Sequence, residues 1–279
     1  MAIGLIAGNG TFPFLVLRAA RRLGHDVVAV AIKGEASPEL ETLARDLDRT
    51  TLTWIELGQL GKAIKALKDG GVSQAVMAGQ VKHVKLFGGV MPDFTLLAVL
   101  GKLTANNTDS LIAAVAGVLQ DHGITLMNST ELLKELVAPA GVLSRARPTS
   151  QMQADFDFGY RVADAIAGVD IGQTVIVKDR AVVAVEGMEG TDAAIARAGS
   201  LAGAGTRVIK VAKPKQDMRF DVPVVGVATI DAMKAAGATA ISVDAGKTLI
   251  VDGERFFEAA NAAGIAVVGR GPSTPAANA

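Results

Sequence analysis

The sequence predicts an α/β protein: a Rossmann-like parallel-sheet N-terminal domain followed by a mixed α/β C-terminal domain. In the first half, short apolar runs alternate with helical patterns, as they do in a parallel sheet covered on both faces. In the second half, two apolar runs flank a short polar turn, which predicts a hairpin. Because 279 residues exceed the usual size of one domain, we expect domains at 1–137 and 152–279, joined by a linker at 138–151 that is punctuated by proline and glycine.

Composition excludes several classes of protein. The 28 basic and 28 acidic side chains cancel, so no overall field holds the chain on nucleic acid, and a single Trp and a single Tyr disfavour base stacking. The absence of cysteine excludes disulfides and thiolate metal sites. The first residues lack the basic region of a signal peptide, and the apolar run at 94–103 is far shorter than the roughly 20 residues that span a bilayer. We therefore expect a cytoplasmic protein that does not bind nucleic acid.

The N-terminal domain is predicted to begin with a phosphate cradle. Strands are expected at 3–7, 27–32, 50–55, 74–78 and 124–127, with helices at 12–23, 59–68 and 110–120. Gly8, Asn9 and Gly10 follow the first strand, and Pro13 lies in the first turn of the next helix. Backbone N–H groups and the positive end of a helix converge at such a turn.

The dinucleotide fingerprint G-x-G-x-x-G is incomplete at this turn. Pro13 replaces the third glycine, and the second strand ends at Lys33 where an acidic residue would hold an adenosine ribose. A cleft for a different nucleotide is therefore a better hypothesis than NAD binding. A glycine turn that serves only close packing is the alternative.

A second group of candidate residues follows the fourth strand. Gly79 and Gln80 lie at the sheet edge where open α/β proteins bind ligands. They begin the run G-Q-V-K-H-V-K-L-F-G-G, after which Met91 and Phe94 extend an apolar surface edged by cations. Such a surface suits acyl chains beside an anionic head group, although a core helix with a solvated basic rim is the alternative. Asp109 fits the first turn of a helix, where a carboxylate complements the dipole.

In the C-terminal domain a helix is expected at 152–167 and a hairpin at 173–178 and 181–186. Strands at 240–244, 248–251 and 266–269 and helices at 231–236 and 255–263 complete it. The run E-G-M-E-G-T-D joins the hairpin to a helix, with Thr191 as the predicted N-cap and Gly190 allowing close backbone approach. Glu186, Glu189 and Asp192 in this run suit Mg²⁺. The alternative is that Asp192 interacts with the helix dipole while Glu189 faces solvent.

The segment from Lys210 to Gly226 reads K-V-A-K-P-K-Q-D-M-R-F-D-V-P-V-V-G and places clustered charges between two apolar strands. Its lysines and arginine are cations of the kind that bind phosphate, and its prolines stiffen both ends. A stiff, charged loop between core strands is a candidate site for chemistry.

The pattern K-x-x-K-P-x-Q-D-x-R-F-D-x-P-x-x-G resembles the signature of the LpxI-type UDP-2,3-diacylglucosamine pyrophosphatases of lipid A biosynthesis. Other stretches resemble this family in the same order along nearly the whole chain. They are G-L-I-A-G-N-G-T-F-P at 4–13, A-G-Q-V at 78–81, T-D-S-L at 108–111, D-I-G-Q at 170–173 and V-E-G-M-E-G-T-D at 185–192.

The resemblance implies a Mg²⁺-dependent hydrolase that cleaves the diphosphate of UDP-2,3-diacylglucosamine to UMP and 2,3-diacylglucosamine 1-phosphate, with a uridine nucleotide in the N-terminal cleft. Asp221, within R-x-D-x-P, carries over as the functional aspartate, either as a metal ligand or as the group that activates water. Arg219 and Lys213 are expected to hold phosphate oxygens. Further metal candidates are Glu186, Glu189 and Asp217, and the substrate-binding candidates are Gly8, Asn9, Gly10, Gly79, Gln80, Asp109, Gly190, Thr191, Lys210 and Gln216.

The rival hypotheses are a non-catalytic sensor of nucleotide sugars or lipids and an NAD-dependent oxidoreductase. The expected partner is an acylated UDP-sugar substrate. Peripheral contact with the inner membrane surface and a homodimer are left open.

Overall fold

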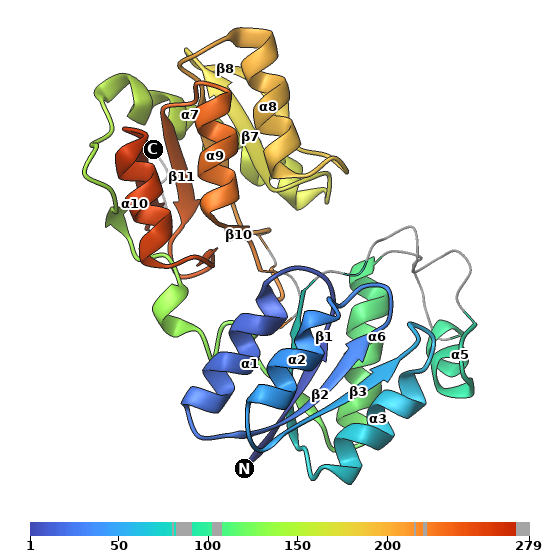
Figure 1. Ribbon diagram of the computed structural model, residues 1–279. Helices are drawn as coiled ribbons and strands as arrows, with labels where there is room; N and C mark the ends of the chain where they lie inside the picture. Colours follow the sequence, from blue (N-terminus) through green and yellow to red (C-terminus); the bar gives the residue numbers. More distant parts are fainter. Residues whose placement is uncertain (80, 82–90, 102–107, 215, 220–221, 272–279) are drawn as a thin grey trace. The chain divides into compact units, whose positions relative to one another are not determined.

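The computed structural model describes residues 1–79, 81, 91–101, 108–214, 216–219 and 222–271. Its chain divides into two units, of which unit 1 comprises Met1–Lys134 with Met218–Phe220, and unit 2 comprises Glu135–Asp217 with Asp221–Ala279. Each unit has its own sheet with helices on both faces (Figure 1). The predicted α/β class is confirmed.

Unit 1 is built on a five-stranded sheet in the order β3-β2-β1-β4-β5, in which all neighbours are parallel. Its central strand, β1, is apolar on both faces and buried from Ile3 onward, as strands between two helical layers must be. The strands are β1 (Ala2–Ala7), β2 (Asp26–Ile32), β3 (Thr50–Ile55), β4 (Gln74–Ala78) and β5 (Thr125–Leu126).

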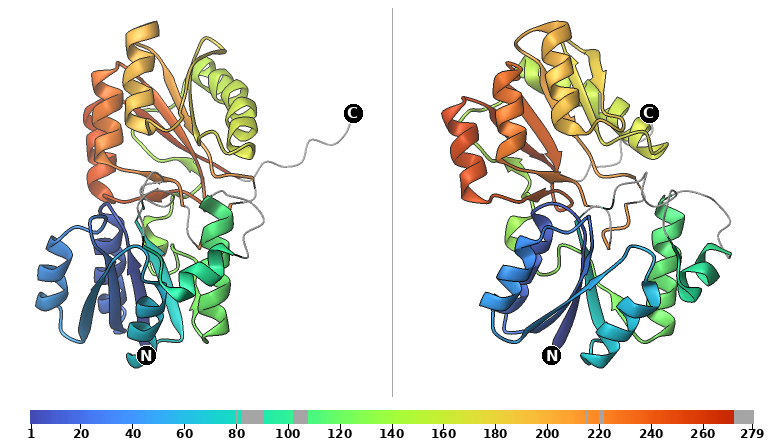
Figure 2. Two further views of the ribbon diagram at one scale, coloured as in Figure 1. Left: turned by 90° about the vertical axis from the view of Figure 1, so that its right-hand side faces the viewer. Right: turned by 45° about the vertical axis from the view of Figure 1, so that its right-hand side comes forward.

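The helices of unit 1 cover both faces of this sheet. On one face α1 packs on α2, while α3 packs on α5 and α5 on α6 across the sheet, as Figure 2 shows. As predicted, Pro13 lies in the first turn of α1, where a backbone N–H would have no helical partner and its absence costs nothing. The helices are α1 (Phe12–Arg22), α2 (Glu39–Asp46), α3 (Leu60–Asp69), α5 (Phe94–Leu100) and α6 (Thr108–Asp121).

Unit 2 has a six-stranded mixed sheet in the order β6-β13-β11-β9-β7-β8. Its inner strands β9, β11 and β13 are parallel, whereas β7 runs antiparallel to β9 and forms the predicted hairpin with β8. Asp179 and Arg180 turn this hairpin with φ of 52° and 59°, as a tight two-residue turn requires. The strands are β6 (Gly141–Val142), β7 (Thr174–Lys178), β8 (Ala181–Val185), β9 (Arg207–Lys210), β11 (Ala240–Asp244) and β13 (Ala266–Arg270).

The helices of unit 2 also form two layers. Phe256 of α10 is buried on one face, in a cluster with residues of α8 and α9, and Phe156 of α7 is buried on the other. The 3-10 turn η1 (Lys134–Leu136) spans the boundary at which this unit begins. The strand β10 (Val224–Val225) pairs with β12 (Leu249–Ile250) in a small parallel sheet. The helices are α7 (Ser150–Gly168), α8 (Thr191–Ala202), α9 (Val227–Ala235) and α10 (Glu254–Ala262).

The turns after β1 and β4 touch each other in unit 1. Gly8 N–H donates to the carbonyl of Ala78 at 2.8 Å, and a Cβ on Gly79 would lie 2.3 Å from the carbonyl oxygen of Asn9. Because strand order reverses between β1 and β4, this is the topological switch point of the sheet, where open α/β sheets bind ligands. Only glycine fits at position 79.

Gly79→Ala is expected to destabilise unit 1 more than Gly10→Ala does. Both glycines have φ near +90° (87° and 90°), but nothing lies within 4 Å of a Cβ at position 10. Strain alone costs about 1–2 kcal/mol, and the backbone clash adds roughly 1–3 kcal/mol at position 79. Urea unfolding followed by fluorescence of Trp54 in β3 measures the difference; equal losses would contradict the close contact.

Candidate active site

Charged side chains gather at one edge of the sheet in unit 2. Lys210, Asp244 and Arg270 are the last residues of the parallel strands β9, β11 and β13. The start of β7 and the end of β8 lie at the same edge. Thr174 of β7 pairs with Lys210, and Val185 of β8 pairs with Val175 of β7. This edge therefore carries most of the predicted site residues of unit 2.

Three predicted residues form one buried chain of hydrogen bonds at this edge. Lys210 Nζ donates to Thr191 Oγ1 at 2.6 Å, and Thr191 Oγ1 donates to Glu186 Oε1 at 2.8 Å. Lys210 and Glu186 are 6% and 9% exposed, and charges so buried require polar partners. The hydroxyl of Thr191 thus links a buried cation to a buried carboxylate.

The prediction that Thr191 is the N-cap of α8 is wrong. Gly190 occupies the cap with φ of 85°, and Thr191 is the first helical residue. Its hydroxyl is engaged by Lys210 and Glu186, so it does not serve the free N–H groups of the helix.

Glu189 has partners of its own. Its carboxylate accepts from Arg197 and from Gly187 N–H, and hydrogen bonds from its own backbone N–H and from Arg197 lower its pKa.

The other metal candidates do not form a cluster in the described part of the chain. Glu186 accepts from Thr191 and, at 3.4 Å, from Gln173 N–H, while Asp217 is half-buried. Asp221 lies outside the described residues, and within those residues no three Asp, Glu or His side chains converge as a metal cluster.

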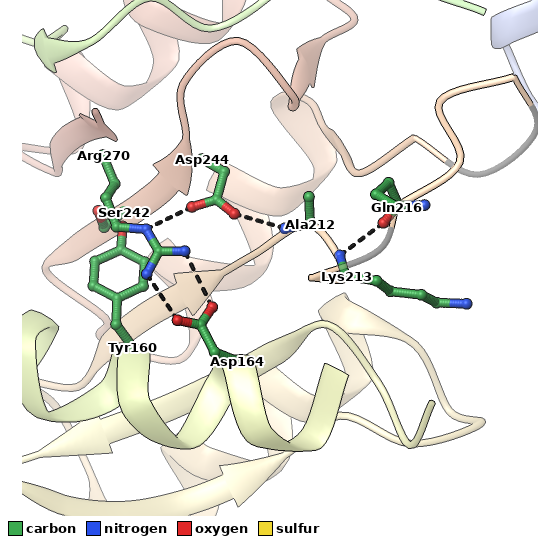
Figure 3. Close-up of polar contacts among 8 residues, drawn as sticks. All are labelled: Tyr160, Asp164, Ala212, Lys213, Gln216, Ser242, Asp244 and Arg270. Atoms are coloured by element: carbon green, nitrogen blue, oxygen red, sulfur yellow. Dashed lines mark hydrogen bonds and ion pairs between the residues drawn. The ribbon is translucent and has the colours of Figure 1, made fainter. Parts of the chain in front are cut away.

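Lys213 and Gln216 lie together in a tight turn, drawn in Figure 3. Gln216 Oε1 accepts from Lys213 N–H at 2.7 Å, and Gln216 N–H donates to the Lys213 carbonyl at 3.0 Å. Lys213 Nζ pairs with Asp170 Oδ1 at 2.6 Å, and Asp170 holds a positive φ of 58°. Gln216 thus fixes the backbone from which the Lys213 ammonium extends.

Arg219, by contrast, belongs to unit 1. Ser129 N–H donates to the Met218 carbonyl at 2.8 Å. Ser129 Oγ lies 2.6 Å from the Arg219 carbonyl and 2.9 Å from that of Met77, so its single proton is shared between them. Because Met77 is near the end of β4, Arg219 lies at the same sheet edge as Gly79.

The other candidates of unit 1 also lie at this edge. Gly8, Asn9 and Gly10 form the turn after β1, and Gly8 and Asn9 of this turn lie against Gly79. Asp109 is the second residue of α6, as predicted for a helical first turn. Gln80 lies outside the described residues.

Comparison with known proteins places this chain in a family. The model of the LpxI N-terminal domain matches residues 2–136, and that of the LpxI C-terminal domain matches residues 139–268. The chain belongs to the LpxI family. The resemblance seen in the sequence is thereby confirmed, and with it the prediction that the protein is an enzyme. The UDP-2,3-diacylglucosamine pyrophosphatase LpxI of Caulobacter vibrioides is 33% identical over 281 residues, which cover 97% of this chain and 98% of the relative.

Two solved structures of biotin carboxylases are only weakly similar to this chain. The biotin carboxylase domain of a thermophilic 2-oxoglutarate carboxylase is 16% identical, with a TM-score of 0.24 over 62% of this LpxI chain and 34% of the other. The biotin carboxylase subunit of pyruvate carboxylase is 17% identical, with a TM-score of 0.23 over 67% and 38%. Neither says anything about the function of this chain.

Thr191→Val is expected to destabilise unit 2 by about 1–3 kcal/mol, because buried Lys210 and Glu186 each lose a hydrogen bond while volume is kept. Differential scanning calorimetry measures the loss. Thr191→Ser retains the hydroxyl and is expected to stay close to the unchanged protein. Equal losses in the two variants would show that the methyl group matters instead.

Ser129→Ala is expected to speed trypsin cleavage after Arg219 about fivefold, since the segment loses a hydrogen bond worth about 1 kcal/mol. Mass spectrometry of the early fragments measures the rate. Ser200→Ala is the matched control, because it removes an exposed hydroxyl that bonds only within α8. An unchanged rate after Arg219 would mean that Ser129 does not hold the segment.

Proposed function

We propose that this LpxI protein hydrolyses the diphosphate of UDP-2,3-diacylglucosamine to UMP and 2,3-diacylglucosamine 1-phosphate. The observation that carries the proposal is the similarity over 97% of this chain and 98% of the relative named as that pyrophosphatase. The described site agrees with this chemistry, because cations at the strand ends suit the anionic oxygens that a phosphoryl transition state presents. Lys213 and Arg219 are proposed to hold phosphate oxygens.

Asp221 is proposed as the residue on which turnover depends, and Mg²⁺ as the cofactor. Mg²⁺ takes one or two carboxylates together with phosphate oxygens and water, so a protein cage of several acids is not required. The carboxylates proposed as its ligands are those of Asp221, Asp217, Glu186 and Glu189. The metal would neutralise charge on the diphosphate.

An apolar strip formed by α5 and the residues just before it is proposed for contact with a membrane surface. Met91 and Phe94 are 91% and 92% exposed, and Leu97 is 49% exposed, and such side chains can enter the boundary of a lipid layer. Across the described residues, no helix combines the length and apolarity that a membrane span needs. The homodimer stays a prediction.

Asp221→Ala is expected to lower UMP release by about 10²- to 10⁴-fold, as loss of a group acting on water or metal does. The assay follows UMP from UDP-2,3-diacylglucosamine with Mg²⁺, and EDTA is expected to abolish the signal until Mg²⁺ is restored. Asp157→Ala, an exposed aspartate on α7, is the control. If the unchanged protein binds the substrate but releases no UMP, the sensor hypothesis replaces this one; near-normal turnover in Asp221→Ala would refute the role of that residue.

A further inference from the structure

Arg270 is a charged residue of the sheet edge that the proposed chemistry leaves unused. Its guanidinium lies between two carboxylates: Nε donates to Asp244 Oδ1 at 2.7 Å, and the two terminal nitrogens donate to Asp164 at 3.1 and 3.2 Å. It also stacks over Tyr160, 3.6 Å from the ring centroid. Figure 3 shows the arginine enclosed by these side chains.

Asp244 connects this arginine to the turn that carries Lys213. Its second oxygen accepts the N–H of Ala212 at 2.8 Å. Ala212 is 3% exposed, and a buried backbone N–H requires an acceptor. Asp244 therefore fixes the backbone one residue before Lys213, and Arg270 holds Asp244.

Neither stability nor phosphate binding explains this arrangement. A partly buried ion network costs desolvation, and apolar residues of similar volume often stabilise a fold equally well. The terminal nitrogens of Arg270 donate to Asp164 and its Nε donates to Asp244, so these donors are used within the protein and not for phosphate. What the network does achieve is to fix the backbone at Ala212 through Asp244.

We propose that Arg270 and Asp244 are positioning residues that set the turn from Lys213 to Gln216 for its work on the diphosphate. Neither side chain touches the substrate; they act through the Ala212 N–H on the place from which Lys213 extends. This inference rests on the proposed function in so far as Lys213 holds phosphate. A shift of about 1 Å in such a group can cost roughly 10²-fold in rate.

The opposite edge of the same sheet offers a matched control. There Asp155 accepts the N–H of Arg180 at 2.7 Å and lies 3.7 Å from Nε of Arg207, the first residue of β9. Arg207 thus pairs with an aspartate that accepts a backbone N–H, just as Arg270 pairs with Asp244. Arg207→Met removes the same kind of support at the end of the strand away from Lys213.

The first experiment measures amide hydrogen exchange at Ala212, Lys213 and Gln216 by mass spectrometry of peptic peptides. Arg270→Met is expected to speed exchange about tenfold there, and Arg207→Met is expected to leave it unchanged. Asp244→Asn, which keeps an acceptor oxygen for Ala212 but loses the ion pair, tests the same contact with little change in volume. Unchanged exchange in both Arg270→Met and Asp244→Asn would overturn the proposal, whatever the protein catalyses.

The second experiment is a double-mutant cycle on UMP release. Arg270→Met is expected to lower kcat about 10- to 100-fold alone, but less than about twofold in a Lys213→Met background, because both changes then act on one group. Arg207→Met is expected to keep kcat even where it lowers the unfolding temperature. Additive losses would show that Arg270 does not act through Lys213. If the unchanged protein releases no UMP, the proposed function fails, and the exchange measurement alone decides the positioning.

Discussion

Parallel strands covered by helices impose the constraint on which the site depends. Because helical layers cover both faces of these strands, the strand interiors are mostly apolar and charged side chains lie at the ends. In β9, Val208 and Ile209 are fully buried while Arg207 and Lys210 occupy the two ends. Because parallel strands end at one edge, residues far apart in sequence are brought together there. The same constraint places the glycine turns of unit 1 beside each other.

Each of the three cations described at this edge of unit 2, Lys210, Lys213 and Arg270, has an oxygen partner, but the pairs differ in exposure. The carboxylate of Asp170, which pairs with Lys213, is 59% exposed, whereas that of Asp244, which pairs with Arg270, is 9% exposed. Exposed ion pairs are worth about 0–1 kcal/mol, so a phosphate group can replace Asp170 at little cost. Breaking a buried pair leaves a buried charge without a partner and is strongly unfavourable. Exposure therefore separates a cation that can exchange its partner from one that keeps it.

The features that could be predicted from the sequence are those that depend on local patterns of apolar and polar residues. Alternating apolar runs gave the parallel sheet of unit 1, and two such runs around a polar turn gave the hairpin. The apolar pair Val224 and Val225 at the end of the charged segment also predicted β10 correctly. The two-residue strand β6 carries no such pattern and was not predicted. Thr191 was misassigned because capping rules consider neighbours in sequence, while its partner Lys210 comes from another strand.

The residues missed at the site were missed for the same reason. Ser129 reaches the Arg219 carbonyl across 90 positions, and Asp244 reaches Ala212 across 32. Nothing in the residue types of such pairs identifies them before the fold is known. One signal was available: Asp244, Arg270 and Ser129 each end or follow a predicted strand, which is where open α/β sheets carry their sites.

Hydrogen bonds hold the backbone of the charged segment at two places. In unit 2 Asp244 accepts the N–H of Ala212, and in unit 1 Ser129 donates to the carbonyl groups of Met218 and Arg219. Fixing a backbone residue costs about 1–2 kcal/mol of conformational entropy. Where anchors inside each unit hold the backbone, that entropy is lost when the protein folds and no longer opposes substrate binding. Preorganised charges are also the kind that stabilise a transition state without first having to reorient. Each anchor therefore fixes its own part of the segment within its own unit, which a proline alone could not do, since a proline restricts φ but fixes no position.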